Sequence, residues 1–428
     1  MTVPINNITI MQAIHKIDPF LRTGKESETL LINQISLLRA SNSKEVFKFG
    51  FGQSPFLVPK IISDSLAKAA HRKEYMSVQG HPSLRQAIVD FHNTMEGRKF
   101  HADNIIIGAG SKILIFSILG AFEKAEIVLP APSWVSYEPQ AKLLRHKVDW
   151  LATKFEDHWS LTPQSLDEYC NNRKNPETPL VLVFNYPNNP TGQTFTPSQL
   201  QALAEVMRKH KVIVIADEIY SLLVYKDRQA SIADYYPEGC IVSSGLSKWC
   251  GAGGWRLGFL HIPKELGTEF FQAVIGVASE TYSCAASPIQ IAATTAYEED
   301  GLANEFISKQ TQLLSQVNDY CTSQLNSSGI RVHPCAGGFY LFPDFSGFKQ
   351  KLNDRQIYTS KHLTTAIMDE TGVALLPGSA FGMKKESLTA RLAFVDFDGS
   401  QILDDNNDAD FEKIKLGIDR LCNWVTGL

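Results

Sequence analysis

The sequence predicts an α/β protein with a largely parallel sheet and helices on both faces, followed by a smaller α+β domain. Apolar runs typical of buried strands alternate with helix-like stretches up to about residue 260. Two of these runs, 180–184 and 211–216, are almost continuously apolar, which is typical of strands buried in a parallel sheet. Beyond residue 299 helix and strand patterns alternate in a new composition, which indicates the second domain.

The length and composition are those of a globular protein with a substantial core. The chain has 428 residues, of which 44% are apolar and 20% charged, and it exceeds one typical domain. A net charge of −4 gives no basic field for nucleic acid, and no apolar run is long enough to span a bilayer. The N-terminus lacks the pattern of a signal peptide, and the seven cysteines form no Cys-x-x-Cys pair. We therefore expect a cytoplasmic protein with reduced thiols, no bound metal, and neither a nucleic-acid nor a membrane partner.

The first part of the chain contains one predicted helix and one predicted loop. Apolar positions recur at helical spacing over 30–38, within a polar segment that ends at residue 48. Two glycines and two prolines over 49–59 predict an irregular loop, which includes Gly52. Tyr75 follows, five positions before Gly80, and taken alone it is a packing residue.

A strand, a glycine turn and a helix are predicted over 104–119. The turn contains Gly110 and leads into Ser111 and Lys112, where the free amides of a helix N-terminus form an anion site. The third glycine of a dinucleotide-binding fingerprint is absent, and Ile113 stands in its place. Lys112 is not followed by the Ser or Thr of a P-loop either, so neither nucleotide motif is present.

Three further strand-like runs are followed by residues that can bind or react. The run 127–129 leads to Trp134, the run 180–184 to Asn189, and the run 211–216 to Asp217 and Tyr220. Strands of a parallel sheet present such residues at one edge. A carboxylate placed there is costly to bury unless a cation meets it. In isolation, Trp134 is a core residue, Asn189 a turn residue and Asp217 a helix N-cap.

The segment 244–258 is the most informative stretch of the chain. It places Ser247, Lys248 and Arg256 within ten residues, in a glycine-rich segment that follows the strand-like run 240–242. These groups are a hydroxyl, an amine that can react with a carbonyl, and a guanidinium that binds phosphate bidentately. The alternative is that Lys248 is one of many solvated lysines. The combination suits a phosphorylated aldehyde cofactor.

These motifs resemble the class I/II aminotransferases, a family of fold-type I pyridoxal-phosphate enzymes, in order from about Phe49 to Arg391. The resemblance implies the aspartate aminotransferase fold, with a mostly parallel seven-stranded sheet flanked by helices. It also implies a large pyridoxal-phosphate-binding domain over 49–300. Residues 1–48, an N-terminal arm, and 301–428 would form the small domain. The cofactor would be pyridoxal 5′-phosphate joined to Lys248.

The resemblance also assigns roles to individual residues. Lys248, Asp217 and Tyr220 would be catalytic, with Asp217 beneath the ring nitrogen and Tyr220 on the phenolic oxygen. Trp134 would stack on the ring, and Asn189 would bond the phenolic oxygen near the substrate carboxylate. The residues around the phosphate would be Gly110, Ser111, Lys112, Ser247, Arg256 and, from the neighbouring subunit, Tyr75. Gly52, Trp134, Asn189 and Arg391 would contact the substrate, with Arg391 holding its carboxylate.

The implied reaction is transfer of an amino group from an amino acid to a 2-oxo acid such as 2-oxoglutarate. The implied assembly is a homodimer in which Tyr75 and the segment 279–283 reach the neighbouring active site. No arginine occurs between Arg256 and Arg331 to bind a second substrate carboxylate, and Glu280 places a negative charge in that region. A neutral or cationic donor side chain is therefore favoured.

Two alternative functions remain open. The same cofactor residues serve other fold-type I enzymes, such as a carbon–sulfur β-lyase, an α-synthase or a decarboxylase. A non-catalytic regulator on this fold is the second, but such proteins carry an N-terminal DNA-binding domain, and the 48 residues before the loop show no such pattern. The acidic stretch 396–410 is predicted to be a solvated loop of unassigned role.

Overall fold

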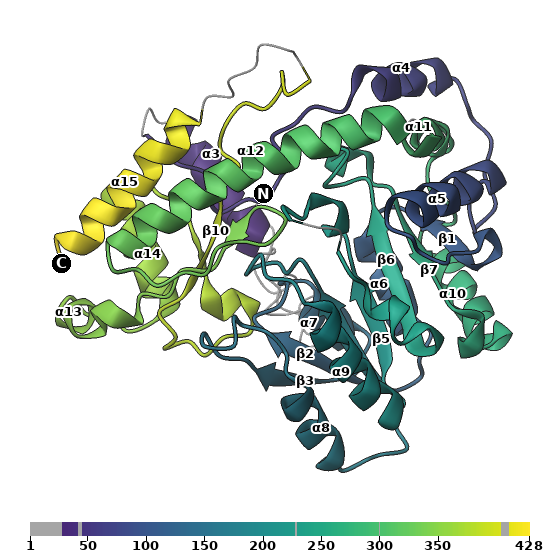
Figure 1. Ribbon diagram of the computed structural model, residues 1–428, viewed down its shortest axis with the longest axis horizontal. Helices are drawn as coiled ribbons and strands as arrows, with labels where there is room; N and C mark the ends of the chain where they lie inside the picture. The colour runs from purple at the N-terminus through teal and green to yellow at the C-terminus, as the bar shows by residue number, and fades with distance from the viewer. Residues whose placement is uncertain (1–27, 42–44, 227–228, 299, 404–410) are drawn as a thin grey trace, which may run out of the picture.

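The computed structural model describes residues 28–41, 45–226, 229–298, 300–403 and 411–428. Its larger sheet has seven strands in the order β1-β7-β6-β5-β4-β2-β3. The neighbouring pairs from β3 to β6 are parallel, and β7 is antiparallel to both β6 and β1. The predicted fold class, an α/β protein with a mostly parallel sheet, is therefore confirmed (Figure 1). The strands are β1 (Ile105–Gly108), β2 (Glu126–Ala131), β3 (Lys147–Ala152), β4 (Leu180–Asn185), β5 (Ile213–Asp217), β6 (Cys240–Gly245) and β7 (Gly258–His261).

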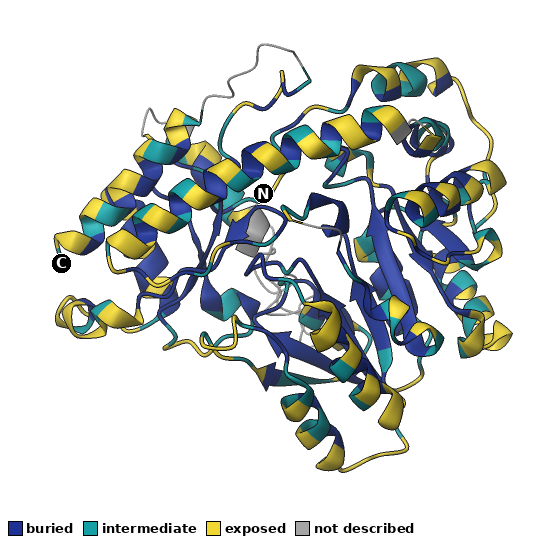
Figure 2. Ribbon diagram, in the orientation of Figure 1, coloured by how far each residue is buried: buried dark blue, intermediate teal, exposed yellow. Residues whose placement is uncertain are grey.

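The central strands are apolar over most of their length because helices cover both faces of the sheet. Along β4, Val181 and Val183 pack into one apolar cluster, whereas Leu180, Leu182 and Phe184 pack into another. This alternation follows from the two-residue period of a strand. The first cluster includes residues of α6, α7 and α10, and the second includes residues of α5, α8, α9 and α11. The central strands are buried, whereas the edge strand β3 and the outer helix faces are more exposed (Figure 2).

The helices of this part lie between and beyond the strands in the chain. Three of them begin with proline at the first helical position, where its missing N–H costs no hydrogen bond. The helices are α4 (Lys60–Ala69), α5 (Pro82–Met95), α6 (Ser111–Gly120), α7 (Tyr137–Leu143), α8 (Pro163–Asn171), α9 (Pro197–Lys209), α10 (Thr268–Thr281) and α11 (Ser287–Glu298).

A second, three-stranded sheet is built from the C-terminal part of the chain in the order β8-β10-β9, with both pairs antiparallel. The long helix α12 packs against α15, and α14 packs against both α15 and β9. In Figure 1, α12 runs across the molecule from α11 to this second sheet. The elements are α3 (Glu28–Ser41), α12 (Asp300–Ser327), β8 (Tyr340–Leu341), α13 (Lys349–Asp354), α14 (Ser360–Thr371), β9 (Leu376–Pro377), β10 (Ala390–Ala393) and α15 (Glu412–Thr426).

Most of the predicted elements are present, and one boundary is wrong. Helix α3 includes the predicted segment 30–38, and residues 51–59 have no regular secondary structure. The sequence pattern over 266–298 predicts mostly helix with a break at 279–284, but α10 continues through Thr281, so this break begins three residues later than expected. The Thr281 hydroxyl donates to the carbonyl of Val277 one turn earlier, a bond that threonine commonly makes within a helix.

Part of two predictions lies outside the described residues. These are the first 27 residues of the N-terminal arm and the segment 404–410 of the acidic stretch. Of the described part of that stretch, Asp396 accepts a hydrogen bond from the backbone of Lys48 and pairs with Lys413. No helix in the described ranges is both long enough and apolar enough to cross a bilayer.

Candidate active site

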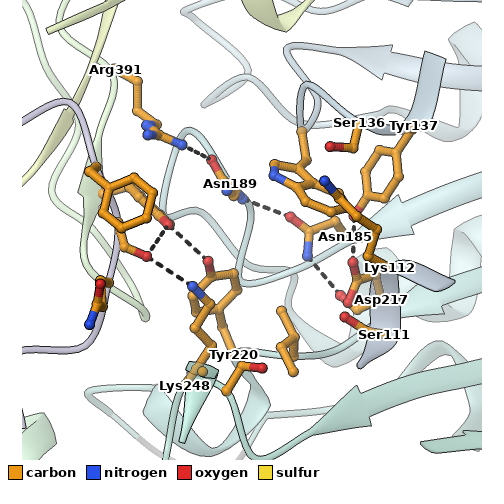
Figure 3. A pocket seen from close by; sticks show the side chains of 18 of the residues that line it. Ser111, Lys112, Ser136, Tyr137, Asn185, Asn189, Asp217, Tyr220, Lys248 and Arg391 are labelled. Atoms are coloured by element: carbon orange, nitrogen blue, oxygen red, sulfur yellow. Dashed lines mark hydrogen bonds between the residues drawn. The ribbon is translucent and has the colours of Figure 1, made fainter. Parts of the chain in front are cut away.

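A cavity of about 540 Å³ opens at the carboxyl ends of the parallel strands. The predicted residues that line it come from several separate elements, because the ends of parallel strands meet at one edge of the sheet. Figure 3 shows this cavity with ten of its residues labelled. The predicted residues among those that line it are Gly52, Ser111, Lys112, Trp134, Asn189, Asp217, Tyr220, Ser247, Lys248, Arg256 and Arg391.

Asp217 is the last residue of β5 and is buried at the base of the cavity. Its Oδ2 accepts a hydrogen bond of 2.6 Å from the hydroxyl of Tyr137, whereas its Oδ1 is buried without a partner among the described residues. Burial raises the pKa of Asp217 to about 6, although the hydrogen bond from Tyr137 opposes the shift. The helix N-cap alternative is wrong, because the next helical turn starts only at Ser221.

An unpartnered buried carboxylate oxygen fits the protonated ring nitrogen of pyridoxal phosphate. A buried acceptor without a hydrogen bond costs roughly 1–3 kcal/mol, and more if it is charged. A cation that donates a hydrogen bond would remove this cost and return the carboxylate to its ionised form. The residues present therefore fit the cofactor that the sequence predicts.

Lys248 lies three residues after the end of β6 and is half-buried. Its Nζ donates a hydrogen bond of 3.0 Å to the carbonyl oxygen of Gly52 and lies 5.3 Å from the ring centres of Tyr220 and Phe339. The amine is thus held inside the cavity on the side of the loop that contains Gly52. The alternative of a solvated surface lysine is wrong for this structure.

Arg391 is fully buried in β10, at 1% exposure, and reaches the cavity from the second sheet. One guanidinium nitrogen donates to Asn189 Oδ1 at 3.0 Å and another to the carbonyl oxygen of Gly50 at 2.7 Å. The rings of Tyr340 and Phe381 flank the guanidinium, at 4.7 and 5.1 Å from their centres. Desolvation by burial lowers the pKa of Arg391. Its Nε is buried without a partner among the described residues, so an anion in the cavity can still be bound.

A chain of hydrogen bonds joins Arg391 to the strand that ends in Asp217 (Figure 3). Asn189 accepts from Arg391, its backbone N–H donates to Asn185 Oδ1 at 2.7 Å, and Asn185 Nδ2 donates to the carbonyl oxygen of Asp217 at 2.8 Å. Asn185 is the last residue of β4, the strand beside β5. This chain connects the two sheets through the cavity.

The anion site predicted at the start of α6 lies against Arg256. Gly110 has a φ of +91°, and a Cβ placed on it would come within 2.4 Å of the Arg256 guanidinium. Gly110 is thus required both for its backbone conformation and for the close approach of Arg256. Arg256 itself has a left-handed φ of +56° and donates to the carbonyl oxygen of Gly253 at 2.9 Å. The ammonium of Lys112, the second residue of α6, lies 5.2 Å from the centre of the Trp134 ring.

Of the predicted residues, Gly110 is not among those that line the cavity, although it lies against Arg256, and neither is Tyr75. The Tyr75 side chain is 92% exposed, and it is absent from the cavity lining, as is the segment 279–283. Both predictions concerned the neighbouring subunit, so these positions leave them open.

Among the lining residues that sequence reasoning missed, three contact the predicted groups. Asn185, Tyr137 and Tyr340 line the cavity and bond or flank the predicted groups. The position of Asn185 at the end of an apolar strand was a usable signal for it. Tyr137 and Tyr340 gave no such signal, because buried tyrosines are common in any core.

The fold and the cavity define a pyridoxal-phosphate-dependent transferase with an α/β sheet of seven strands. Residues 44–396 match the family described as aminotransferase class I and II. The chain belongs to this family and is a pyridoxal-phosphate-dependent aminotransferase.

Relatives and solved structures agree with this classification. The aspartate/prephenate aminotransferase of Cereibacter sphaeroides is 29% identical over 371 residues, which are 84% of this chain and 90% of that one. A probable N-acetyl-LL-diaminopimelate aminotransferase of Bacillus subtilis is 31% identical over 87% of this chain and 90% of its own. The aspartate aminotransferase of Thermus thermophilus with maleate superimposes with a TM-score of 0.83 at 22% identity, over 96% of this chain and 100% of that one, and so supports the fold.

Proposed function

We propose that this cavity binds pyridoxal phosphate through Lys248 and carries out transamination with 2-oxoglutarate as an amino-group acceptor. The observation that carries the proposal is the pairing of Lys248 and Asp217 in one cavity. Lys248 presents an amine that is held at 3.0 Å from the carbonyl oxygen of Gly52. Asp217 presents a buried carboxylate oxygen that has no partner among the described residues.

Several of the side chains that line the cavity have separate proposed roles in the reaction. When bound, pyridoxal phosphate supplies a carbonyl carbon that condenses with amines and a cationic ring that accepts electrons. Asp217 would keep a proton on the ring nitrogen, and Tyr220 and Asn189 would bond the phenolic oxygen. Lys248 Nζ would hold the cofactor and move the proton at the substrate α-carbon. Arg391 would bind the substrate carboxylate through its planar fork, beside Gly52.

The phosphate corner, which consists of Gly110 and Ser111 at the start of α6 together with Arg256, would hold the cofactor phosphate. Ser111 supplies an amide at a helix N-terminus, Gly110 leaves room for Arg256 to approach it, and Arg256 supplies a guanidinium. Ser247, which also lines the cavity, would add a hydroxyl, and Trp134 would stack on the ring. Lys112 lies beside Trp134 and supplies a further positive charge near the cavity, which suits a second carboxylate such as that of 2-oxoglutarate.

We also propose the division into domains and the assembly that the sequence predicts. Residues 49–300 would form the large domain, and 1–48 and 301–428 the small domain, with Arg391 carrying the small domain's contribution to the site. The homodimer would bring Tyr75 and the segment 279–283 to the neighbouring site. A cytoplasmic location is supported by the seven cysteines, all of them unpaired. The donor preference for a neutral or cationic side chain near Glu280 stays a prediction.

The test is substitution of Lys248 by alanine. We expect wild-type protein purified with pyridoxal phosphate to show a visible absorption band that borohydride removes, with the cofactor then fixed covalently to the chain. Lys248→Ala should show neither, and its transamination rate should fall by about 10⁴-fold or more, because both the attachment and the proton transfer are lost. The exposed Lys264→Ala is the matched control and should behave as wild type.

Product analysis separates transamination from the other chemistry of this fold. With an amino acid donor and 2-oxoglutarate, the proposal requires glutamate and the matching 2-oxo acid in equal amounts. Pyruvate and ammonia without glutamate would instead indicate a β-lyase. An unaltered spectrum in Lys248→Ala would exclude Lys248 from the chemistry altogether.

A further inference from the structure

A second tyrosine, Tyr340, is buried in the cavity beside Tyr220. It is the first residue of β8, is 2% exposed, and pairs with Ala393 of β10, two residues from Arg391. Its ring meets that of Tyr220 edge to face at 5.7 Å between centres. Tyr340 therefore lies between two groups with proposed roles, Tyr220 and Arg391.

The Tyr340 hydroxyl contacts two oxygens. It is 3.0 Å from the Tyr220 hydroxyl and donates at 3.4 Å to the carbonyl oxygen of Gly52. The same carbonyl accepts from Lys248 Nζ at 3.0 Å. A Cβ on Gly52 would lie 1.9 Å from the Tyr340 hydroxyl oxygen, so only glycine permits this approach. Two tyrosine hydroxyls, one amine and one carbonyl thus form a single connected group.

The number of protons in this group limits what it can do. Each phenol has one proton to donate, and its oxygen can also accept. While Tyr340 donates to Gly52, the contact between the tyrosines requires Tyr220 to donate to Tyr340. Tyr220 then has no proton left for the cavity. If Tyr340 instead donates to Tyr220, the Tyr220 proton becomes available in the cavity.

We propose that Tyr340 is a positioning residue whose hydroxyl turns from Gly52 to Tyr220 when the cofactor is bound, so that Tyr220 donates to the cofactor's phenolic oxygen. This inference rests on the proposed function, in which Tyr220 faces that oxygen. A hydroxyl that accepts a hydrogen bond becomes a better donor, because neighbouring bonds polarise one another. Tyr340 therefore strengthens the Tyr220 bond without touching the phenolic oxygen itself.

The ring of Tyr340 has a separate task. It lies 4.7 Å from the Arg391 guanidinium carbon, and the Phe381 ring lies 5.1 Å from the same carbon. This contact depends on the aromatic face and not on the hydroxyl. Tyr340→Phe therefore removes the hydroxyl task alone, and Tyr340→Leu removes both.

The experiment compares Tyr340→Phe, Tyr220→Phe and the double variant, each loaded with pyridoxal phosphate. The first readout is the pH midpoint of the visible absorption of the lysine-bound cofactor. A donor on the phenolic oxygen stabilises its anion, so losing the donor raises this midpoint. We expect Tyr220→Phe to raise it, Tyr340→Phe to raise it by about a third as much, and the double variant to match Tyr220→Phe.

The second readout is the dissociation constant of a carboxylate inhibitor, maleate. Tyr340→Phe should leave it within about twofold of wild type, whereas Tyr340→Leu should weaken binding by about tenfold. The matched control is Tyr225→Phe, a buried tyrosine whose hydroxyl donates to the carbonyl oxygen of Gly338, two residues before Tyr340. This control should keep the wild-type midpoint and the wild-type maleate affinity.

The outcomes separate this inference from the proposed function. If Tyr220→Phe leaves the midpoint unchanged, the proposed role of Tyr220 fails, and the role of Tyr340 fails with it. If Tyr220→Phe raises the midpoint but Tyr340→Phe does not, or if the two shifts add in the double variant, only the Tyr340 proposal is overturned. A midpoint shift in Tyr225→Phe equal to that in Tyr340→Phe would attribute the effect to displaced backbone and would also overturn it.

Discussion

At the scale of single residues, the ionised Asp217 carboxylate has opposite effects on the stability of the cofactor-free protein and of the protein with pyridoxal phosphate bound. Burial raises its pKa from 3.8 to about 6, so the folded state favours the protonated carboxyl. The folded protein binds more protons than the unfolded chain between about pH 4 and pH 6, so the stability due to Asp217 is present below this range and lost as the pH rises through it. The protonated ring nitrogen of a bound cofactor would instead favour the ionised carboxylate.

We predict that Asp217→Asn stabilises the cofactor-free protein above pH 6. The gain over wild type should be roughly 1–3 kcal/mol, because asparagine keeps an acceptor for Tyr137 and needs no ionisation. The gain should vanish below about pH 4, where both side chains are neutral. Denaturant unfolding of the two apo proteins from pH 4 to 8 measures the difference. With pyridoxal phosphate bound, the order should reverse, and transamination should fall by at least about 100-fold. A difference between the variants that does not change with pH would contradict the burial argument.

Single residues also show where sequence reasoning reaches its limit. Lys248, Asp217 and Asn189 could be placed in one site from the sequence, because each follows an apolar run and parallel strands end at one edge. The partners of these residues could not, since they depend on the packing of side chains distant in sequence. Tyr137 bonds Asp217 across 80 positions, and Tyr340 meets Tyr220 across 120.

At the scale of elements, the contact between β7 and the start of α6 sets the geometry of the proposed phosphate corner. Gly258, the first residue of β7, faces backbone on both sides. A Cβ there would lie 2.7 Å from the amide nitrogen of Ser111 and 2.9 Å from the carbonyl oxygen of Ser244. Backbone atoms in a sheet and a helix turn cannot rotate away as a flexible side chain can.

Gly258→Ala should therefore displace the start of α6. We expect a loss of stability of roughly 1–3 kcal/mol from overpacking and a loss of pyridoxal phosphate affinity of about tenfold or more, since the Ser111 amide would move. Calorimetry and cofactor titration measure the two effects. Gly276→Ala in α10 is the matched control, because nothing lies within 4 Å of its Cβ. That change should raise stability by about 0.5–1 kcal/mol through helix propensity and leave cofactor affinity unaltered. Equal cofactor affinity in both variants would show that β7 does not position α6.

Element boundaries were predictable where a local rule sets them. Helices α8 and α9 begin at prolines after threonine caps, which the sequence displays directly. The end of α10 was not, because Ser279 and Thr281 are weaker helix formers that the helix nevertheless contains. Strand order is likewise a tertiary property. β7 enters between β1 and β6 as an antiparallel strand, and its sequence contains nothing that specifies this direction.

At the scale of the whole molecule, the site is built where two sheets meet. Asp217 ends one strand of the seven-stranded sheet, Lys248 follows another, and Arg391 comes from the three-stranded sheet. The hydrogen bond from Arg391 to Asn189 joins positions 202 residues apart. The relative position of the two sheets therefore sets the distance between the guanidinium that would bind the substrate carboxylate and the amine that would react. Any movement of one sheet against the other would change this distance.

The proposed dimer predicts that two defective chains can restore one another. Tyr75 is 92% exposed in the single chain and would serve the neighbouring site, whereas Lys248 serves its own. Tyr75→Ala should weaken pyridoxal phosphate binding, and Lys248→Ala should abolish activity. In a hybrid of the two, one site carries both lesions and the other carries none. Random pairing of co-expressed chains should then give restored sites worth roughly a quarter of the wild-type activity, and these sites should all lie in the dimer fraction isolated by two different affinity tags. Mixing the separately purified proteins without subunit exchange is the control and should restore nothing. If Tyr75 acted within its own chain, every hybrid site would be defective, and the tagged dimers would be no more active than Tyr75→Ala alone.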